Sequence, residues 1–290
     1  MRVFLTGGSG QLGRELLRSA PDDAVIDAPG RSQLSLTDHE TVAKMVAATQ
    51  PDLVINTAAY TDVDRAERES PQAFAVNADG ARALADAASA VGARMIQVST
   101  DFVFDGCTDR AYRPEDEATP LGAYGASKLA GEQAVAAALP EQSLVVRTSW
   151  LFSSSGRNFV TTMLRLLAER DEVPVAADQV GSPTSARNLA CALWRWTTIP
   201  GASGIRHLSD KGIASWYDLA VAVREQAAAV GLLEGGAVIR PTRTRDDPAA
   251  AKRPRFSALD SSASWRETGL EAQHWRASLP HVLLDVAGHG

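Results

Sequence analysis

The stretch Arg2-Val3-Phe4-Leu5-Thr6-Gly7-Gly8-Ser9-Gly10-Gln11-Leu12-Gly13 decides the fold of this chain. A short apolar run leads into a glycine-rich turn, and residues 14–18 (RELLR) follow with helical spacing. This order predicts a buried strand, a tight turn and a helix whose N-terminus accepts a dinucleotide pyrophosphate. An ordinary glycine-rich loop is the alternative, and the strand–turn–helix context favours phosphate binding. The expected cofactor contacts in this turn are Gly7, Gly10, Gln11, Leu12 and Gly13.

Beyond the turn, apolar strands alternate with helical segments, which predicts an α/β fold with a Rossmann-type, doubly wound parallel sheet. A single alanine-rich helix is expected over residues 71–91, with Gly92 as its stop. We expect residues 1–170 to form the NAD(P)-binding core. Residues 171–290 then form mainly a smaller C-terminal, substrate-binding α/β portion, and the chain returns to the core around 185–209.

Composition excludes several classes of protein. The chain has 290 residues, 45% of them hydrophobic and 22% charged, and a net charge of −6, so it shows no basic footprint for nucleic acid or an anionic membrane. Its two cysteines, Cys107 and Cys191, support neither a disulfide framework nor a zinc site, and no metal site is expected. Without a signal-peptide pattern or a long apolar run, a cytoplasmic location is expected.

The end of the second strand selects the dinucleotide. Residues 24–28 (AVIDA) read as that strand, and Arg31 and Ser32 follow it. An arginine at this position accommodates a 2′-phosphate, whereas an acid such as Asp27 would bond the ribose 2′-OH of NAD. The sequence favours NADPH, with NADH as the alternative. Ala58, Ala59 and Tyr60 follow the next buried strand and are expected to lie against the cofactor.

Tyr124 and Lys128 are spaced i to i+4, so a helix places them on one face. An ammonium beside a phenol lowers the phenol's pKa, which suits a tyrosine that gives a proton to a carbonyl oxygen. Such a pair is common by chance on amphipathic helices. Here it accompanies the glycine turn and Ser99-Thr100 at the end of a strand, where a hydroxyl completes the trio around a substrate oxygen.

At these residues the chain resembles the extended short-chain dehydrogenase/reductases, which use a Ser/Thr, Tyr and Lys trio. Further stretches narrow the resemblance to the dTDP-4-dehydrorhamnose reductases, and they span nearly the whole chain. These stretches are 56–67 (NTAAYTDVDRAE), 99–106 (STDFVFDG), 124–132 (YGASKLAGE), 147–152 (RTSWLF), 158–160 (NFV), 178–184 (DQVGSPT) and 253–257 (RPRFS). The resemblance implies NAD(P)H-dependent reduction of the 4-keto group of a dTDP-linked 6-deoxyhexose.

The resemblance also implies roles for single residues. Thr100 would polarise the carbonyl, Tyr124 would protonate the resulting alkoxide, and Lys128 would lower the tyrosine pKa and bond the nicotinamide ribose. The expected substrate contacts are Val63, Asp64, Glu67, Thr100, Trp150, Asn158, Gln179 and Arg253. Position 102 departs from the family pattern, because Phe102 stands where the family usually has Tyr and lacks its hydroxyl.

Two other functions remain open at this point. One is a sugar-nucleotide epimerase or dehydratase that keeps NAD tightly bound, although Phe102 replaces the second acid of the dehydratase pair. The other is a non-catalytic regulatory subunit on the same fold. A metal-linked dimer has no support near residues 187–188, so a monomer or weak homodimer is expected. A basic stretch that includes Arg243, Arg245 and Lys252 suits an anionic sugar nucleotide.

Overall fold

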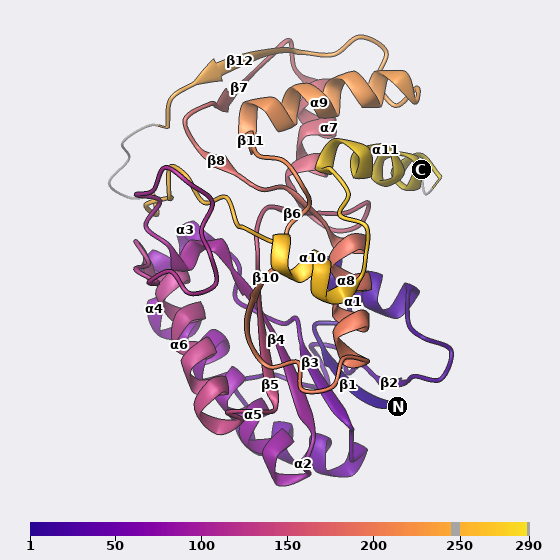
Figure 1. The fold of residues 1–290 in the computed structure, drawn as a ribbon. Coiled ribbons are helices and arrows are strands. Elements are labelled where there is room, and N and C mark those ends of the chain that lie inside the picture. The colour runs from indigo at the N-terminus through magenta and orange to yellow at the C-terminus, as the bar shows by residue number, and fades with distance from the viewer. Residues whose placement is uncertain (245–249, 289–290) are drawn as a thin grey trace.

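A six-stranded parallel sheet forms the centre of the larger lobe (Figure 1). The computed structural model describes residues 1–244 and 250–288, so Arg245 lies outside the described residues. In spatial order the strands are β10 (Gly204–His207), β5 (Ser143–Thr148), β4 (Arg94–Thr100), β3 (Leu53–Asn56), β1 (Arg2–Thr6) and β2 (Val25–Asp27). Strand order reverses beside β1, which is where open α/β sheets bind ligands.

Helices cover both faces of this sheet. One face packs against α1 (Gln11–Arg18) and α8 (Ala186–Thr197), and the other against α2 (His39–Thr49), α5 (Gly80–Ala90) and α6 (Ala123–Ala138). Strands buried on both sides read as apolar runs, and Leu53–Asn56 is buried at every position. The doubly wound Rossmann-type fold predicted from the sequence is confirmed.

The helix expected over 71–91 is not a single α-helix. The structure has α3 (Val63–Arg68), then α4 (Ser70–Phe74), a π turn at Ala75–Asp79 and α5. Asn77 in the π turn donates to Ser127 Oγ at 2.9 Å and accepts from Tyr60 N at 2.8 Å. The extra residue of the π turn thus aims an amide at two neighbouring segments, a contact that helical periodicity does not report.

The smaller lobe has its own core. It contains α7 (Phe159–Glu169), β7 (Glu172–Ala176), α9 (Trp216–Ala229), β12 (Val238–Thr242) and α11 (Trp275–Ala287), with β7 and β12 paired in parallel. Val160, Met163 and Leu167 of α7 are buried in this core, so the smaller core already includes residues before 171. Between β7 and α9 the chain returns to the larger lobe as α8 and β10.

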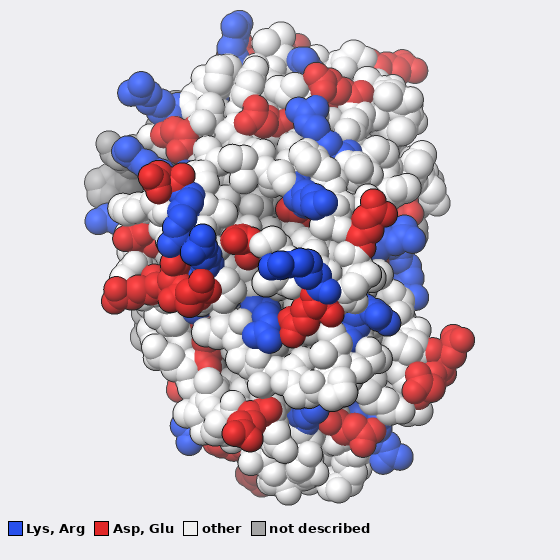
Figure 2. Space-filling model, in the orientation of Figure 1, with Lys and Arg blue, Asp and Glu red and all other residues white. Residues whose placement is uncertain are grey.

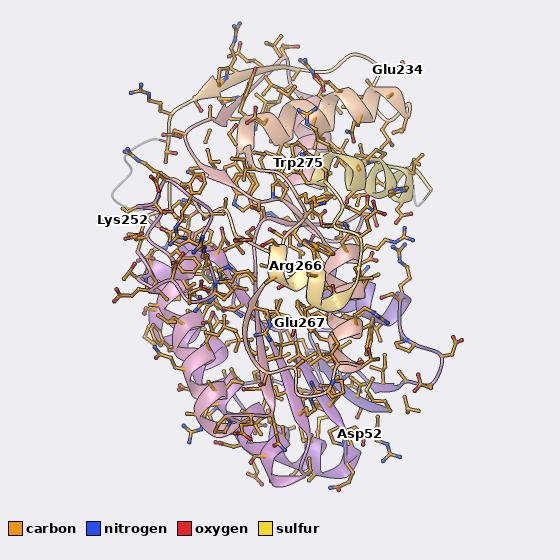
Figure 3. All side chains as sticks on the ribbon, in the orientation of Figure 1. Asp52, Glu234, Lys252, Arg266, Glu267 and Trp275 are labelled. Atoms are coloured by element: carbon orange, nitrogen blue, oxygen red, sulfur yellow. The ribbon has the colours of Figure 1, made fainter. Side chains whose placement is uncertain are left out.

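Short elements connect the two lobes. β6 (Leu151–Phe152) pairs with β9 (Thr184–Ser185), β8 (Val180–Gly181) pairs with β11 (Ala214–Ser215), and α10 (Ser262–Thr268) packs on α8. Figure 3 labels Trp275 in the smaller lobe and Asp52 near the opposite end of the molecule. Lys and Arg are interspersed with Asp and Glu over the face seen in Figure 2. Among the described residues, no helix is both long and apolar enough to cross a membrane.

Candidate active site

The glycine turn between β1 and α1 leaves room only for backbone. Gly7 has φ +74°, and a Cβ at Gly13 would lie 2.2 Å from the Gly7 carbonyl oxygen. Gly10, the N-cap of α1, offers no side chain to bond the first N–H groups of the helix, and the first turn carries no acid. Its free N–H groups and positive dipole end are therefore open to an anion. Gln11 accepts from Ser153 Oγ at 3.0 Å, which ties the turn to the loop after β6.

The residues expected around the rest of the cofactor lie at the carboxyl ends of neighbouring strands. Arg31 and Ser32 are exposed after β2, free to meet a ligand. The Asp27 carboxylate instead accepts from Thr49 Oγ1 at 2.8 Å. The backbone at Ala58, which leads to Ala59 and Tyr60, lies against the glycine turn. A Cβ at Gly7 would lie 2.7 Å from Ala58 N.

Packing of α6 against the end of β4 assembles Thr100, Tyr124 and Lys128. The 3-10 turn η2 (Asp101–Val103) follows β4, and a Cβ at Gly125 would lie 2.1 Å from the Phe102 carbonyl oxygen. Only glycine permits this approach, which brings Tyr124 to the Thr100 hydroxyl. The Phe102 ring packs edge-on against Tyr124 at 5.5 Å, so this residue keeps the ring contact without a hydroxyl.

The expected lowering of the Tyr124 pKa is not observed. Burial is the main cause that raises the pKa of Tyr124 to about 12; the hydrogen bond with Thr100 opposes the rise and the Asp101 carboxylate adds to it. The Lys128 ammonium donates to the Val98 carbonyl at 2.7 Å, and burial lowers the pKa of Lys128 to about 8. The prediction was wrong for the protein alone because desolvation outweighs the attraction that i, i+4 spacing suggests.

Sequence reasoning missed the part that Asp101 plays in this site. Its carboxylate lies between Thr100 Oγ1, 3.2 Å from Oδ1, and Ser257 Oγ, which donates to Oδ2 at 2.6 Å. Burial raises the pKa of Asp101 to about 6, and both hydroxyls oppose that rise. No local signal pairs Asp101 with Ser257, because the two residues are far apart in the sequence.

A pair of stacked indoles lines the candidate site on the side of the smaller lobe. Trp150 and Trp216 are parallel with ring centroids 3.5 Å apart, and Trp216 Nε1 donates to Gln179 Oε1 at 3.1 Å. Trp150 has φ +46°, a strained conformation for a non-glycine residue. A Cβ at Gly181 would lie 2.6 Å from the Trp150 ring. Trp216 was not predicted as a site residue, since the start of an amphipathic helix explains an aromatic residue equally well.

Several expected substrate residues bond to each other or to backbone. Arg253 donates to Asp64 at 2.7 Å, which joins α3 to the segment 250–259. This ion pair and the Ala251 N–H hold the pKa of Asp64 below its usual range. Glu67 accepts from Ala123 N at 2.8 Å and so caps α6 just before Tyr124. A small pocket places the expected contacts Val63 and Glu67 beside Tyr124; its lining also includes Phe102, Lys252 and Pro254.

Asn158, another expected substrate contact, stabilises the start of α7. It is the N-cap of α7, accepting from Thr161 N at 3.1 Å, and its amide donates to the Ser153 carbonyl at 2.9 Å. Ser153 is also the donor to Gln11, so Asn158 and the glycine turn meet through one residue. The structure thereby links the start of the smaller lobe to the cofactor turn.

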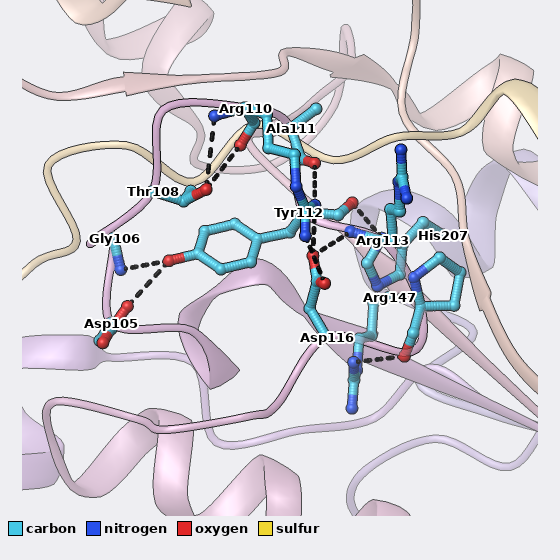
Figure 4. A network of polar contacts seen from close by, with 11 residues as sticks. Asp105, Gly106, Thr108, Arg110, Ala111, Tyr112, Arg113, Asp116, Arg147 and His207 are labelled. Carbon is cyan, nitrogen blue, oxygen red and sulfur yellow. Dashed lines mark hydrogen bonds and ion pairs between the residues drawn. The ribbon is translucent and has the colours of Figure 1, made fainter.

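A second buried polar cluster underlies the site. Arg147 on β5 bonds Glu132 through two nitrogens, at 2.7 and 3.0 Å, and Glu132 also accepts from Ser99. His207 on β10 bonds the Tyr112 carbonyl through Nδ1, and burial lowers the pKa of His207 to about 3. Figure 4 shows how the loop over Arg147 is held, with Tyr112 reaching Asp105 and Gly106.

Comparisons with known proteins agree with this geometry. A family model described as "RmlD substrate binding domain" matches residues 1–287. A Streptomyces griseus protein named dTDP-4-dehydrorhamnose reductase is 42% identical, covering 99% of this chain and 94% of its own length. The crystal structure of a dTDP-4-dehydrorhamnose reductase from Clostridium acetobutylicum has a TM-score of 0.91 and 36% identity, covering 99% of this chain and 100% of that one. One from Bacillus anthracis, in complex with NADP, has a TM-score of 0.89 and 36% identity, with 98% of each chain covered.

Proposed function

We propose that this chain, which belongs to the RmlD substrate binding domain family, is an NADPH-dependent reductase of the 4-keto group of a dTDP-4-dehydro-6-deoxyhexose. One observation carries the proposal. Thr100, Tyr124 and Lys128 meet at the carboxyl end of β4, at the same edge of the sheet as the glycine turn, in a chain similar to these reductases over nearly its whole length. The substrate that fits the relatives' names is dTDP-4-dehydro-L-rhamnose, with dTDP-L-rhamnose as product.

The residues around the turn fit a bound NADPH. The pyrophosphate fits at the uncapped N-terminus of α1, beside Gly13, where a Cβ would take up the space. The exposed Arg31 suits the 2′-phosphate. When bound, NADPH supplies the hydride for the sugar's C4. Ala58, Ala59 and Tyr60 would lie along it on the neighbouring strand end.

Tyr124 is the proton donor. With a pKa raised to about 12, its phenol is fully protonated at neutral pH. A sugar alkoxide is more basic than a phenolate, so the proton moves from Tyr124 to the C4 oxygen as hydride reaches C4. One ketone, one hydride and one proton give one alcohol. Thr100 bonds the same oxygen, and Lys128 stabilises the phenolate that remains.

The substrate lies between the lobes in this proposal. Arg253 and its neighbour Lys252 suit the diphosphate, and Trp150 with Gln179 suits the sugar side. Val63, Asp64, Glu67 and Asn158 complete the predicted contacts. The division into a cofactor portion and a substrate portion, the cytoplasmic location and the monomer or weak homodimer stay predictions.

The test uses purified protein with dTDP-4-dehydro-6-deoxyhexoses and either NADPH or NADH. We expect oxidation of NADPH with stoichiometric formation of a dTDP-6-deoxyhexose, identified by NMR. Absence of turnover with every sugar would contradict the proposal. Protein that keeps stoichiometric NAD through desalting would instead favour an epimerase or dehydratase, and protein that binds both ligands without turnover would favour a regulatory subunit.

A further inference from the structure

Asp101 is a buried acid that pairs with no cation among residues 1–244 and 250–288. Its residue is 2% exposed, and its contacts among the described residues are hydroxyl and backbone groups, chiefly Thr100 and Ser257. Ser257 is equally buried. A carboxylate taken from water without a positive partner favours its neutral form. Asp101 is also the immediate neighbour of the hydroxyl that faces the substrate oxygen.

The single proton of the Thr100 hydroxyl makes the state of Asp101 decisive. Thr100 Oγ1 already accepts from Phe102 N at 3.2 Å, Asp101 Oδ1 lies 3.2 Å away, and Tyr124 is the third hydrogen-bonding neighbour of this hydroxyl in the protein without substrate. An ionised carboxylate only accepts, so it takes the Thr100 proton for itself. A protonated Asp101 donates to Thr100 Oγ1 instead, and then the Thr100 proton is available to a carbonyl oxygen.

We propose that Asp101 is a positioning residue that works in its protonated form, donating to Thr100 so that Thr100 can donate to the substrate carbonyl. The inference rests on the proposed reductase function. It assigns Ser257, from the segment 250–259, a part in the site as well, because its hydroxyl donates to Oδ2 and sets how easily Asp101 ionises.

The groups facing Asp101 leave its titration separate from theirs. On α6, Tyr124 has a pKa raised to about 12, and Lys128, with a pKa lowered to about 8, bonds Val98. In the segment 250–259, Arg253 pairs with Asp64, and Arg255 is exposed. Burial raises the pKa of Asp101 itself to about 6. Protonated Asp101 is therefore lost as the pH rises through this value.

Asp101→Asn tests the proposal directly. An asparagine can accept from Ser257 and donate to Thr100, so it imitates the protonated acid at every pH. The expected ratio of kcat/KM, variant over wild type, rises about tenfold per pH unit between pH 6 and 8 as Asp101 ionises in the wild type. Titration of Lys128 affects both proteins and cancels. Asp86→Asn, at an exposed ion pair on α5, is the matched control and should keep a constant ratio. A ratio for Asp101→Asn that stays constant or falls overturns the proposal.

Ser257→Ala covers the case in which Asp101→Asn does not fold. Removal of the hydroxyl that favours ionised Asp101 should move the alkaline fall in kcat/KM to higher pH. An unmoved fall, or one at lower pH, counts against the proposal.

Infrared difference titration gives a readout without substrate. Burial also raises the pKa of Asp210 to about 6, so all three proteins share its carboxyl band at pH 5. Wild-type protein should show one protonated carboxyl more than Asp101→Asn, and Asp86→Asn should match wild type. An identical spectrum for wild type and Asp101→Asn overturns the protonation. If the protein shows this additional carboxyl but reduces no dTDP-sugar, the reductase function is overturned, and with it the catalytic part of this proposal. The protonation of Asp101 would still be established.

Discussion

Two carboxylates buried near the end of β4 have opposite surroundings. Glu132 is 3% exposed and meets the Arg147 guanidinium at 2.7 Å, while that guanidinium lies 5.1 Å from the centre of the Phe104 ring. Asp101 is just as buried, and within the part of the chain that the structure describes its carboxylate meets hydroxyl and backbone donors only. A charge paired with a guanidinium is held in one state and serves the fold, whereas an acid paired with hydroxyls can change its protonation and serve chemistry.

Tyr124→Phe should give the largest effect on the catalytic side of this comparison. Loss of the proton donor is expected to lower kcat by ~100- to 10,000-fold, while the ring contact with Phe102 and the fold persist. The measurement is NADPH oxidation under saturating substrate, with NADPH binding followed by fluorescence. Tyr217→Phe in the smaller lobe is the control and should keep full activity. A Tyr124→Phe variant with undiminished turnover would remove the mechanism.

Glu132→Gln should act on stability instead. The change leaves the Arg147 charge buried without its partner, so we expect the free energy of unfolding to fall by about 3–5 kcal/mol, as for other broken buried ion pairs. Urea unfolding followed by circular dichroism measures it. Replacement of both residues, Glu132→Gln with Arg147→Met, should recover part of the loss because no unpaired charge remains. A Glu132→Gln variant as stable as wild type would show that the Glu132–Arg147 ion pair does not stabilise this cluster.

His207 sharpens the comparison with a smaller, pH-dependent effect. Burial first, and the Arg147 charge second, lower its pKa to about 3, against 6.5 in an unfolded chain. Between these values the unfolded chain binds the extra proton, so stability is lost as the pH falls from 6.5 towards 3, by at most ~1.4 kcal/mol per pH unit. His207→Gln should flatten this slope in urea unfolding at several pH values, and exposed His39→Gln should not. Equal slopes in wild type and His207→Gln would refute the assignment.

Local patterns predicted much of the larger lobe because each depends on residues close in the chain. The strand–glycine turn–helix order at residues 2–18 corresponds to β1 and α1. The π turn at Ala75–Asp79 was not predictable, since it depends on what Asn77 meets across the fold.

The sequence by itself determined that Tyr124 and Lys128 share a helix face and that a glycine turn precedes a helix N-terminus, because spacing alone decides both. Tertiary structure decided that Asp101 meets Ser257, 156 positions away, and that Trp150 stacks on Trp216. It also decided the direction of the Tyr124 pKa, since desolvation depends on everything packed around a phenol and not on its neighbours in sequence. Contacts between residues far apart in the sequence thus determine which buried acid is paired with a cation and which is left to change its protonation.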